Sequence, residues 1–171
     1  MTTTKQLINR FIKYELIVGI LCILIPFILI LINGEILNSI SAFAYSKNDF
    51  IYVWLLTMGG ILITVVGIRQ NKPLMWVMGI FLLIVPLAPF VEFPIIHFTS
   101  AGIFFLGVVI DIIIDTQRLF KYRWVMVGVI ISLFIFHFFL NLISLFWVES
   151  ILIIIFGINL LLDLIHEKKD L

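Results

Sequence analysis

The sequence predicts an all-α fold: a single integral membrane bundle of six transmembrane helices, with the amino terminus and the carboxyl terminus both in the cytoplasm. Its composition is the first observation behind this prediction, because 63% of the 171 residues are hydrophobic and only 12% are charged. Soluble domains contain about 45–50% apolar and about 25% charged residues. The apolar runs are continuous rather than alternating, which indicates helices and not the strands of a membrane barrel.

The second observation is the number of apolar runs, since each crossing of the bilayer needs about 20 apolar residues. Pro26 predicts a kink in the first span, and Gly59 and Gly60 give the second span a face for close helix packing. Pro73 stands at the first turn of the third span, where its missing N–H costs little. The predicted spans cover residues 14–32, 50–68, 74–91, 93–115, 122–142 and 147–165, and an external loop covers residues 33–49.

The fourth span begins beside Pro94, and the fifth and sixth come from one apolar stretch between Tyr122 and Ile165. This stretch is too long for one span and sufficient for two. We divide it where Asn141, Ser144 and Trp147 interrupt the aliphatic pattern, because polar and aromatic residues mark the membrane interface.

The third observation is the distribution of positive charge, because cytoplasmic loops carry an excess of lysine and arginine. With the amino terminus inside, ten of the eleven basic residues fall in inner segments and only Lys47 falls outside. Five spans, or the opposite orientation, would scatter them. The ten inner residues are Lys5, Arg10, Lys13, Arg69, Lys72, Arg118, Lys121, Arg123, Lys168 and Lys169.

Three carboxylates are predicted to lie within or at the inner ends of the spans, namely Asp111, Asp115 and Glu15. Asp115 is expected to pair with Arg118 at the membrane surface. Asp111 lies one turn deeper, where an unpaired charge costs about 2.5–3.5 kcal/mol, so it requires either a partner or a role with an ion or substrate. Glu15 is open to the same two interpretations. The reachable partners of Asp111 are Arg69, Lys72, Arg123 and Tyr14.

Most of the remaining polar chemistry falls on the outer side. The external loop alternates polar residues with Ile, Leu and Phe, which predicts a short amphipathic segment on the outer leaflet. His97 opens the fourth span opposite this loop, and His137 and Asn141 are expected one turn apart on the fifth. The candidate ligand-binding residues are Glu35, Tyr45, Asp49, Glu92, His97, His137, Asn141 and Glu149.

Three chemistries could use this outer cluster. Zinc-assisted hydrolysis would employ His97 and His137 with a carboxylate (Glu92, Glu149 or Asp49), although no metal-binding spacing such as HExxH is present and no metal is assigned. A serine hydrolase would employ Ser39 or Ser41 as the nucleophile with His97 as the base. The third interpretation is non-catalytic: a polar pocket for a lipid head group, or hydrogen bonds that lock helix ends. The sequence requires no cofactor.

Two segments carry a resemblance to a known family. SISAFAYS covers Ser39–Ser46, HFTSAGIFF covers His97–Phe105, and a span of the type VWLLTMGGILITVVGIR lies between them. In this order they resemble the DRAM/Frag-type six-span membrane proteins and their bacterial relatives. The resemblance implies a six-helix bundle with an extracytoplasmic loop packed on the start of the fourth span, and eukaryotic members are linked to lipid remodelling. By position it carries over Ser39, Ser41, Tyr45 and His97.

The function expected from these patterns is the binding or processing of a lipid or other amphipathic molecule in an extracytoplasmic pocket, with membrane lipid as the partner. The expected location is the bacterial inner (cytoplasmic) membrane. One alternative is a non-catalytic subunit or homo-oligomer that docks other spans on the face around Gly59 and Gly60. A further alternative is a channel, transporter or pore-forming effector. Nothing in the sequence predicts binding to nucleic acid.

Overall fold

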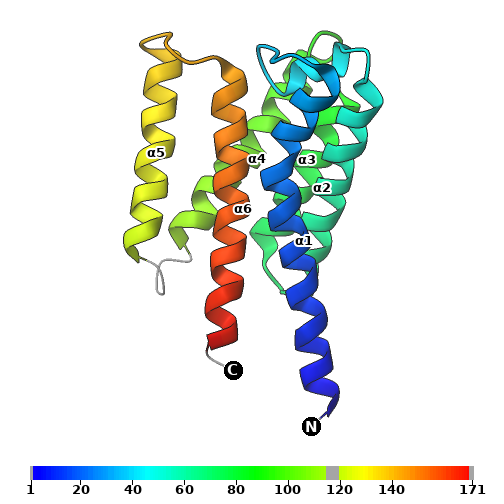
Figure 1. Ribbon diagram of the computed structural model, residues 1–171, viewed down its shortest axis with the longest axis vertical. Coiled ribbons are helices and arrows are strands. Elements are labelled where there is room, and N and C mark those ends of the chain that lie inside the picture. The colour runs from blue at the N-terminus through cyan, green and yellow to red at the C-terminus, as the bar shows by residue number, and fades with distance from the viewer. Residues whose placement is uncertain (1, 115–119, 170–171) are drawn as a thin grey trace.

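The computed structural model describes the backbone of residues 2–114 and 120–169, and the side chains of residues 14–114 and 122–165. Within these residues the chain is all-helical, with six α-helices, one short 3-10 helix and no strand. This confirms the predicted all-α class (Figure 1). The elements are α1 (Thr2–Asn33), η1 (Ser41–Tyr45), α2 (Asp49–Arg69), α3 (Pro73–Leu87), α4 (Pro94–Ile114), α5 (Phe120–Phe138) and α6 (Leu145–Lys169).

Four of these helices contain segments long and apolar enough to cross a membrane, and they identify the chain as a membrane protein. The segments are Tyr14–Asn33, Asp49–Arg69, Pro94–Ile114 and Leu145–Ile165. Two further apolar helices are shorter, with described bounds Pro73–Leu87 and Tyr122–Phe138.

The shorter helices end before the positions that the sequence predicts. α3 ends at Leu87 rather than near residue 91, because Pro89 lacks a donor and disfavours the helical conformation of the residue before it. α5 ends at Phe138 rather than near residue 142, and Asn141 adopts a left-handed φ of 54°. Asparagine tolerates this conformation better than most residues, so Asn141 belongs to the turn and not to a helix face shared with His137.

Close glycine contacts join the helices in pairs. A Cβ on Gly79 of α3 would lie 2.2 Å from Thr64 Oγ1 of α2, and one on Gly60 would lie 2.9 Å from the Gly79 carbonyl oxygen. α1 meets α6 in the same way, since a Cβ on Gly157 would lie 2.6 Å from the Gly19 carbonyl oxygen. Small residues at such crossings let two backbones approach closely. Gly60 therefore packs against α3 within the chain.

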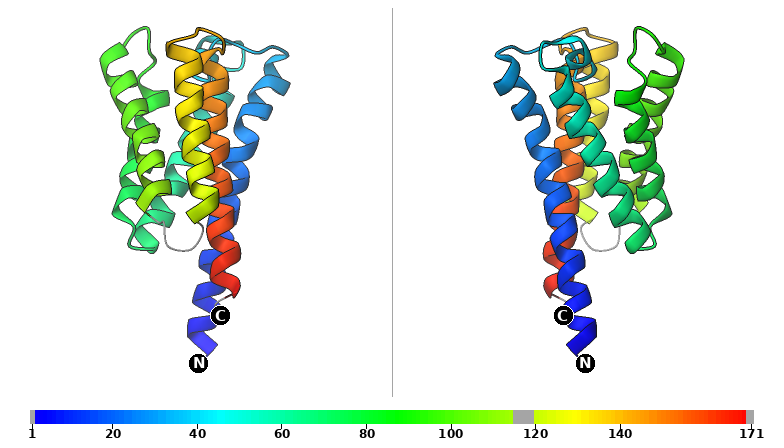
Figure 2. Two further views of the ribbon diagram at one scale, coloured as in Figure 1. Left: turned by 90° about the vertical axis from the view of Figure 1, so that its left-hand side faces the viewer. Right: turned by 90° about the vertical axis from the view of Figure 1, so that its right-hand side faces the viewer.

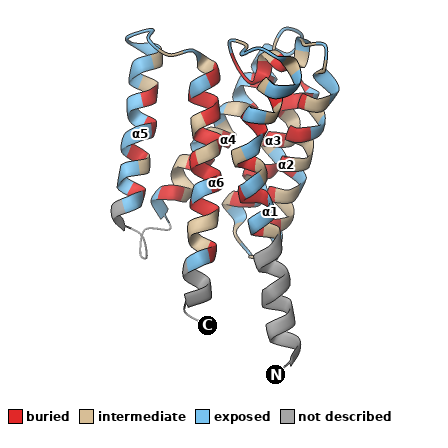
Figure 3. Cartoon of the chain, viewed as in Figure 1, coloured by how far each residue is buried: buried red, intermediate tan, exposed pale blue. Residues whose placement is uncertain are grey.

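The bundle has two distinct ends. The start of α1 and the end of α6 lie at one of them, called here the terminal end, and η1 lies at the other, called here the loop end (Figures 1 and 2). α5 lies at one side, next to α4 and α6, and exposes much of its surface in this isolated chain (Figure 3). The most deeply buried side chains lie in the other helices and include Phe104 of α4 and Phe156 of α6, whose ring centroids are 6.2 Å apart.

Candidate functional site

The segment between α1 and α2 folds into the loop end of the bundle. Ser39 Oγ accepts the Ala42 N–H at 3.0 Å and so starts the single turn of η1. Ile40 and Phe43 are 3% and 0% exposed, and the Phe43 ring lies 6.1 Å from that of Phe146 in α6. The sequence predicts a short amphipathic segment here, lying on or dipping into the outer leaflet. Ile40 and Phe43 instead pack among the helices, because the loop buries more apolar surface there.

Ser41 of η1 is hydrogen-bonded to His97 of α4, which is 1% exposed. His97 Nε2 lies 2.9 Å from Ser41 Oγ, while Nδ1 lies 2.9 Å from the Ala88 carbonyl oxygen and 3.2 Å from that of Val85. Carbonyl oxygens only accept, so Nδ1 carries a proton. In the neutral ring Nε2 is then the acceptor, and the Ser41 hydroxyl donates to it.

Glu149 of α6 holds the same segment from the opposite side. Its Oε2 accepts the Ile40 N–H at 2.6 Å, and the Ser41 N–H also donates to this carboxylate. The Phe146 N–H donates to the Asn38 carbonyl oxygen at 2.8 Å. Since a carboxylate next to unpaired N–H groups at a helix start is favourable, Glu149 stabilises η1 in its docked position.

Tyr45 joins η1 to the turn between α3 and α4. Its hydroxyl donates to Glu92 Oε2 at 2.7 Å and accepts the Val91 N–H at 2.9 Å. The Tyr45 and Phe90 rings meet edge to face, 5.1 Å apart. Partial desolvation, together with the hydrogen bond to Glu92, raises the pKa of Tyr45, so the phenol remains a donor well above neutral pH.

The other candidate residues do not join this cluster. Glu35 is exposed and lines a separate basin of about 750 Å³ formed by the loop and the adjoining helix ends. Asp49 Oδ1 accepts the Phe50 N–H at 2.7 Å, within the first turn of α2. His137 Nδ1 lies 2.8 Å from the Ile143 carbonyl oxygen and supports the turn in which Asn141 lies.

The zinc arrangement considered from the sequence is not formed. Within the described residues, no three His, Cys, Asp or Glu side chains gather to hold a metal ion. Both ring nitrogens of His97 already have partners, and Glu92 accepts the Tyr45 hydroxyl. A metal would have to displace hydrogen bonds that hold the loop in place.

In the Ser41–His97 pair the hydroxyl donates to the imidazole, as in a serine nucleophile and its base. The surroundings of the pair nevertheless favour a structural role. Acyl transfer requires hydrogen-bond donors directed at the oxyanion that develops beside the nucleophile. Here the Ser41 N–H already donates to the Glu149 carboxyl group, so this donor is not available to an oxyanion. The adjacent cavity has room for one water-sized molecule only. We therefore interpret Ser41–His97 as the bond that fastens the loop to α4.

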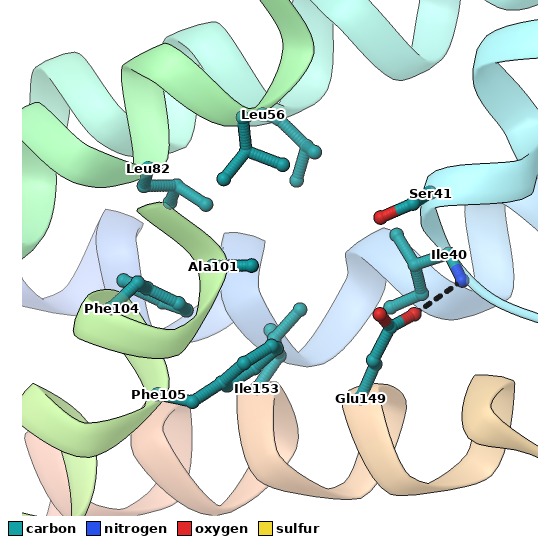
Figure 4. A pocket seen from close by; sticks show the side chains of 10 residues that line it. Ile40, Ser41, Leu56, Leu82, Ala101, Phe104, Phe105, Glu149 and Ile153 are labelled. Atoms are coloured by element: carbon teal, nitrogen blue, oxygen red, sulfur yellow. Dashed lines mark hydrogen bonds between the residues drawn. The ribbon is translucent and has the colours of Figure 1, made fainter. Parts of the chain in front are cut away.

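This small cavity measures about 20 Å³. Figure 4 shows Ser41, Ile40 and Glu149 at one end of it and the apolar side chains of α2, α3 and α4 around the rest. A volume of about 10–15 Å³ or more holds a water molecule, which needs polar partners. Ser41 and Glu149 provide them, so the cavity fits one ordered water.

A much larger groove lies between α4, α5 and α6. Its volume is about 450 Å³, within the range of small-molecule sites. Phe98, Leu106 and Phe138 on its lining are 58%, 59% and 66% exposed, so the groove opens sideways from the bundle. The lining residues are His97, Phe98, Ala101, Gly102, Phe105, Leu106, Val109, Phe134, His137, Phe138, Leu145, Val148, Glu149 and Leu152.

Near the terminal end, the acidic side chains have structural partners. Arg123 is 3% exposed and its Nη2 lies 2.6 Å from Asp163 Oδ1 of α6. The Gln70 side chain donates to buried Glu15. The Arg69 guanidinium lies 4.6 Å from the centre of the Tyr14 ring.

Of the two aspartates predicted at the end of the fourth span, the structure describes only Asp111. Asp111 is half-buried and has an interaction partner. Asp115 and Arg118, the pair expected at the membrane surface, lie outside the described residues.

Three residues of the site were not predicted from the sequence. The carbonyl groups of Val85 and Ala88 fix the tautomer of His97, and backbone acceptors leave no mark in a sequence. Tyr52 is fully buried next to Ser41, and no pattern in the sequence distinguishes it from an interfacial tyrosine.

Fold and site together define a helical membrane protein with a fastened loop above a lateral apolar groove. The chain belongs to the family described as Family of unknown function (DUF7103), whose family model matches residues 24–164. No curated protein and no solved structure matches the chain. The resemblance to DRAM/Frag-type proteins stays a prediction.

Proposed function

We propose that this protein crosses the bacterial cytoplasmic membrane six times, with both termini inside, and binds a lipid or similar amphiphile in the groove between α4, α5 and α6. The groove is the observation that carries the proposal. Among its lining residues only His97, His137 and Glu149 are polar, and all three belong to the loop end of their helices. An apolar site with a few polar groups at one end matches the chemistry of an amphiphile.

The length of the groove fits one leaflet. His97 and Val109 both line it, and their separation along α4 is about 18 Å at 1.5 Å per residue. Half of a typical hydrocarbon core is about 15 Å. An acyl chain entering sideways from the extracytoplasmic leaflet would therefore extend from the polar end to about the middle of the bilayer.

The six-span topology rests on α3 and α5 acting as spans besides the four long helices. α3 has 15 residues and a length of about 22 Å, which a bilayer accommodates by local thinning. The single basic residue of the α1–α2 loop, Lys47, lies at the loop end, while Arg69 and Lys72 lie between α2 and α3 at the opposite end. This asymmetry supports an extracytoplasmic loop end.

Two glycines provide a matched test. A Cβ on Gly102 or on Gly128 meets nothing within 4 Å, but Gly102 lines the groove and Gly128 does not. Gly102→Phe should fill the groove and reduce co-purified lipid about tenfold, measured by native mass spectrometry of protein released from mild detergent. Gly128→Phe should retain the lipid of the unmodified protein. Equal loss in both variants, or an unmodified protein without bound lipid, would overturn the proposal.

A further inference from the structure

The polar end of the groove offers hydrogen-bond acceptors. His97 has both nitrogens engaged, by Ser41 and by the backbone of the α3 end, and contributes little to a ligand. His137 Nδ1 faces the Ile143 carbonyl oxygen at 2.8 Å, and because a carbonyl only accepts, Nδ1 is protonated. In the neutral ring Nε2 is then an acceptor, and His137 is one of the residues that line the groove.

Glu149 is the second acceptor. Its carboxylate lines the groove and receives the N–H groups of Ile40 and Ser41. An ionised carboxylate has about four lone-pair positions. Two N–H donors therefore leave acceptor capacity for a ligand.

Donors for an anion are lacking. Among the described residues that line the groove there is no lysine, arginine, serine, threonine or amide side chain. A phosphate or carboxylate head group would find no donor side chain on this lining and would face Glu149, whose Oε2 already accepts the Ile40 N–H. Phosphate-binding sites use arginine, lysine or free backbone N–H groups, and here the N–H groups of the loop are already occupied by Glu149.

We propose, on the basis of the lipid-binding function above, that the ligand is a single-chain amphiphile whose head group donates hydrogen bonds and carries no negative charge. A hydroxyl or an ammonium group has this chemistry. The chain lies along α4 as far as Val109, and the head group donates to Glu149 and to His137 Nε2. The same lining disfavours anionic head groups because it offers them no donor side chain.

Four probes with one chain length test this inference: tetradecanol, tetradecylamine, tetradecanoic acid and tetradecyl phosphate. Each is added to the delipidated full-length protein in a non-ionic detergent, and occupancy is measured by native mass spectrometry across a concentration series. The alcohol and the amine should bind at least about tenfold more tightly than the acid and the phosphate. An acid or phosphate that binds as tightly as the alcohol would overturn the head-group inference and leave the lipid-binding function standing. Failure of all four would overturn both.

Two variants connect the preference to its residues. Glu149→Gln keeps the size and an acceptor oxygen but replaces the other carboxyl oxygen by an NH₂ donor that an anion can use, so the advantage of the amine over the acid should fall about tenfold. His137→Asn can still donate to the Ile143 carbonyl but loses the acceptor at Nε2, so binding of the alcohol should weaken several-fold. An unchanged ranking in both folded variants would contradict the inference. If either variant fails to fold, the ranking of the four probes on the unmodified protein still tests the head-group preference.

Discussion

At the scale of single residues, His97 shows how both nitrogens of a buried imidazole can find hydrogen-bond partners. Its Nδ1 donates to the backbone at the end of α3, and its Nε2 accepts from Ser41 in the loop. A buried polar group that loses its partner costs free energy, whereas a satisfied one costs little. His97 therefore links α3, α4 and η1 through two bonds of one ring.

Ser41→Ala removes the donor and leaves Nε2 of a 1% exposed histidine without its partner. We expect a loss of about 1–3 kcal/mol in the free energy of unfolding. His97→Phe removes the other partner, and the double variant should cost less than the sum of the single ones, with a coupling of about 0.5–3 kcal/mol. Denaturant unfolding in detergent micelles measures all three variants.

The control for this cycle is Ser132→Ala. Ser132 is exposed on α5, and its hydroxyl only donates to the Gly128 carbonyl oxygen one turn earlier. Its substitution should change the free energy of unfolding by less than about 0.5 kcal/mol. Strict additivity of Ser41→Ala and His97→Phe would show that the two residues do not interact in the folded protein.

At the scale of elements, the helices differ in how closely they pack. α2 and α3 approach through glycines, with no room for a methyl group at Gly79. The groove separates α5 from part of α4 and α6, and Gly102 on α4 has open space beside it. The closely packed α2–α3 pair and the open groove between α4, α5 and α6 are therefore different parts of the bundle.

Gly79→Ala and Gly102→Ala should accordingly have opposite effects. A Cβ at Gly79 would lie 2.5 Å from the Thr64 backbone nitrogen, so α3 must shift away from α2, at a cost of about 1–3 kcal/mol. A Cβ at Gly102 meets no atom within 4 Å, so the higher helix propensity of alanine should be neutral or stabilising by up to about 1 kcal/mol. Thermal unfolding of both variants in one detergent tests the contrast. A Gly79→Ala variant as stable as Gly102→Ala would contradict the described α2–α3 packing.

The positions of the helices could be predicted from the sequence, whereas their ends and the contacts between them could not. Continuous apolar runs bounded by charge and proline predict where helices lie, and the all-helical class followed from them. The helix ends at Leu87 and Phe138 depended on local backbone conformation, which apolar composition does not reveal. The position of His97 at the start of its helix could be predicted, but its partners could not, because one comes from a loop 56 residues away and the other two are backbone carbonyls, which no side-chain pattern marks.

At the scale of the whole molecule, the fastened loop and the groove share two side chains. Glu149 holds the Ile40 N–H and also lines the groove, and His97 receives Ser41 and also lines the groove. A ligand at the polar end of the groove therefore contacts the residues that hold η1. The polar end of the groove lies at the loop end of the bundle. The lipid-binding proposal therefore requires that the loop end face the extracytoplasmic leaflet.

Single cysteines can establish this orientation, because the natural Cys22 is only 2% exposed and should react slowly with a membrane-impermeant maleimide. Lys47→Cys, in the exposed α1–α2 loop, should be labelled in intact cells. Lys72→Cys, between α2 and α3, should be labelled only after the membrane is permeabilised, because cytoplasmic segments hold most of the basic residues. Labelling of both positions in intact cells would contradict α2 as a span, and the reverse pattern would place the polar end of the groove in the cytoplasmic leaflet. The unmodified chain, with Cys22 alone, gives the background against which both signals are read.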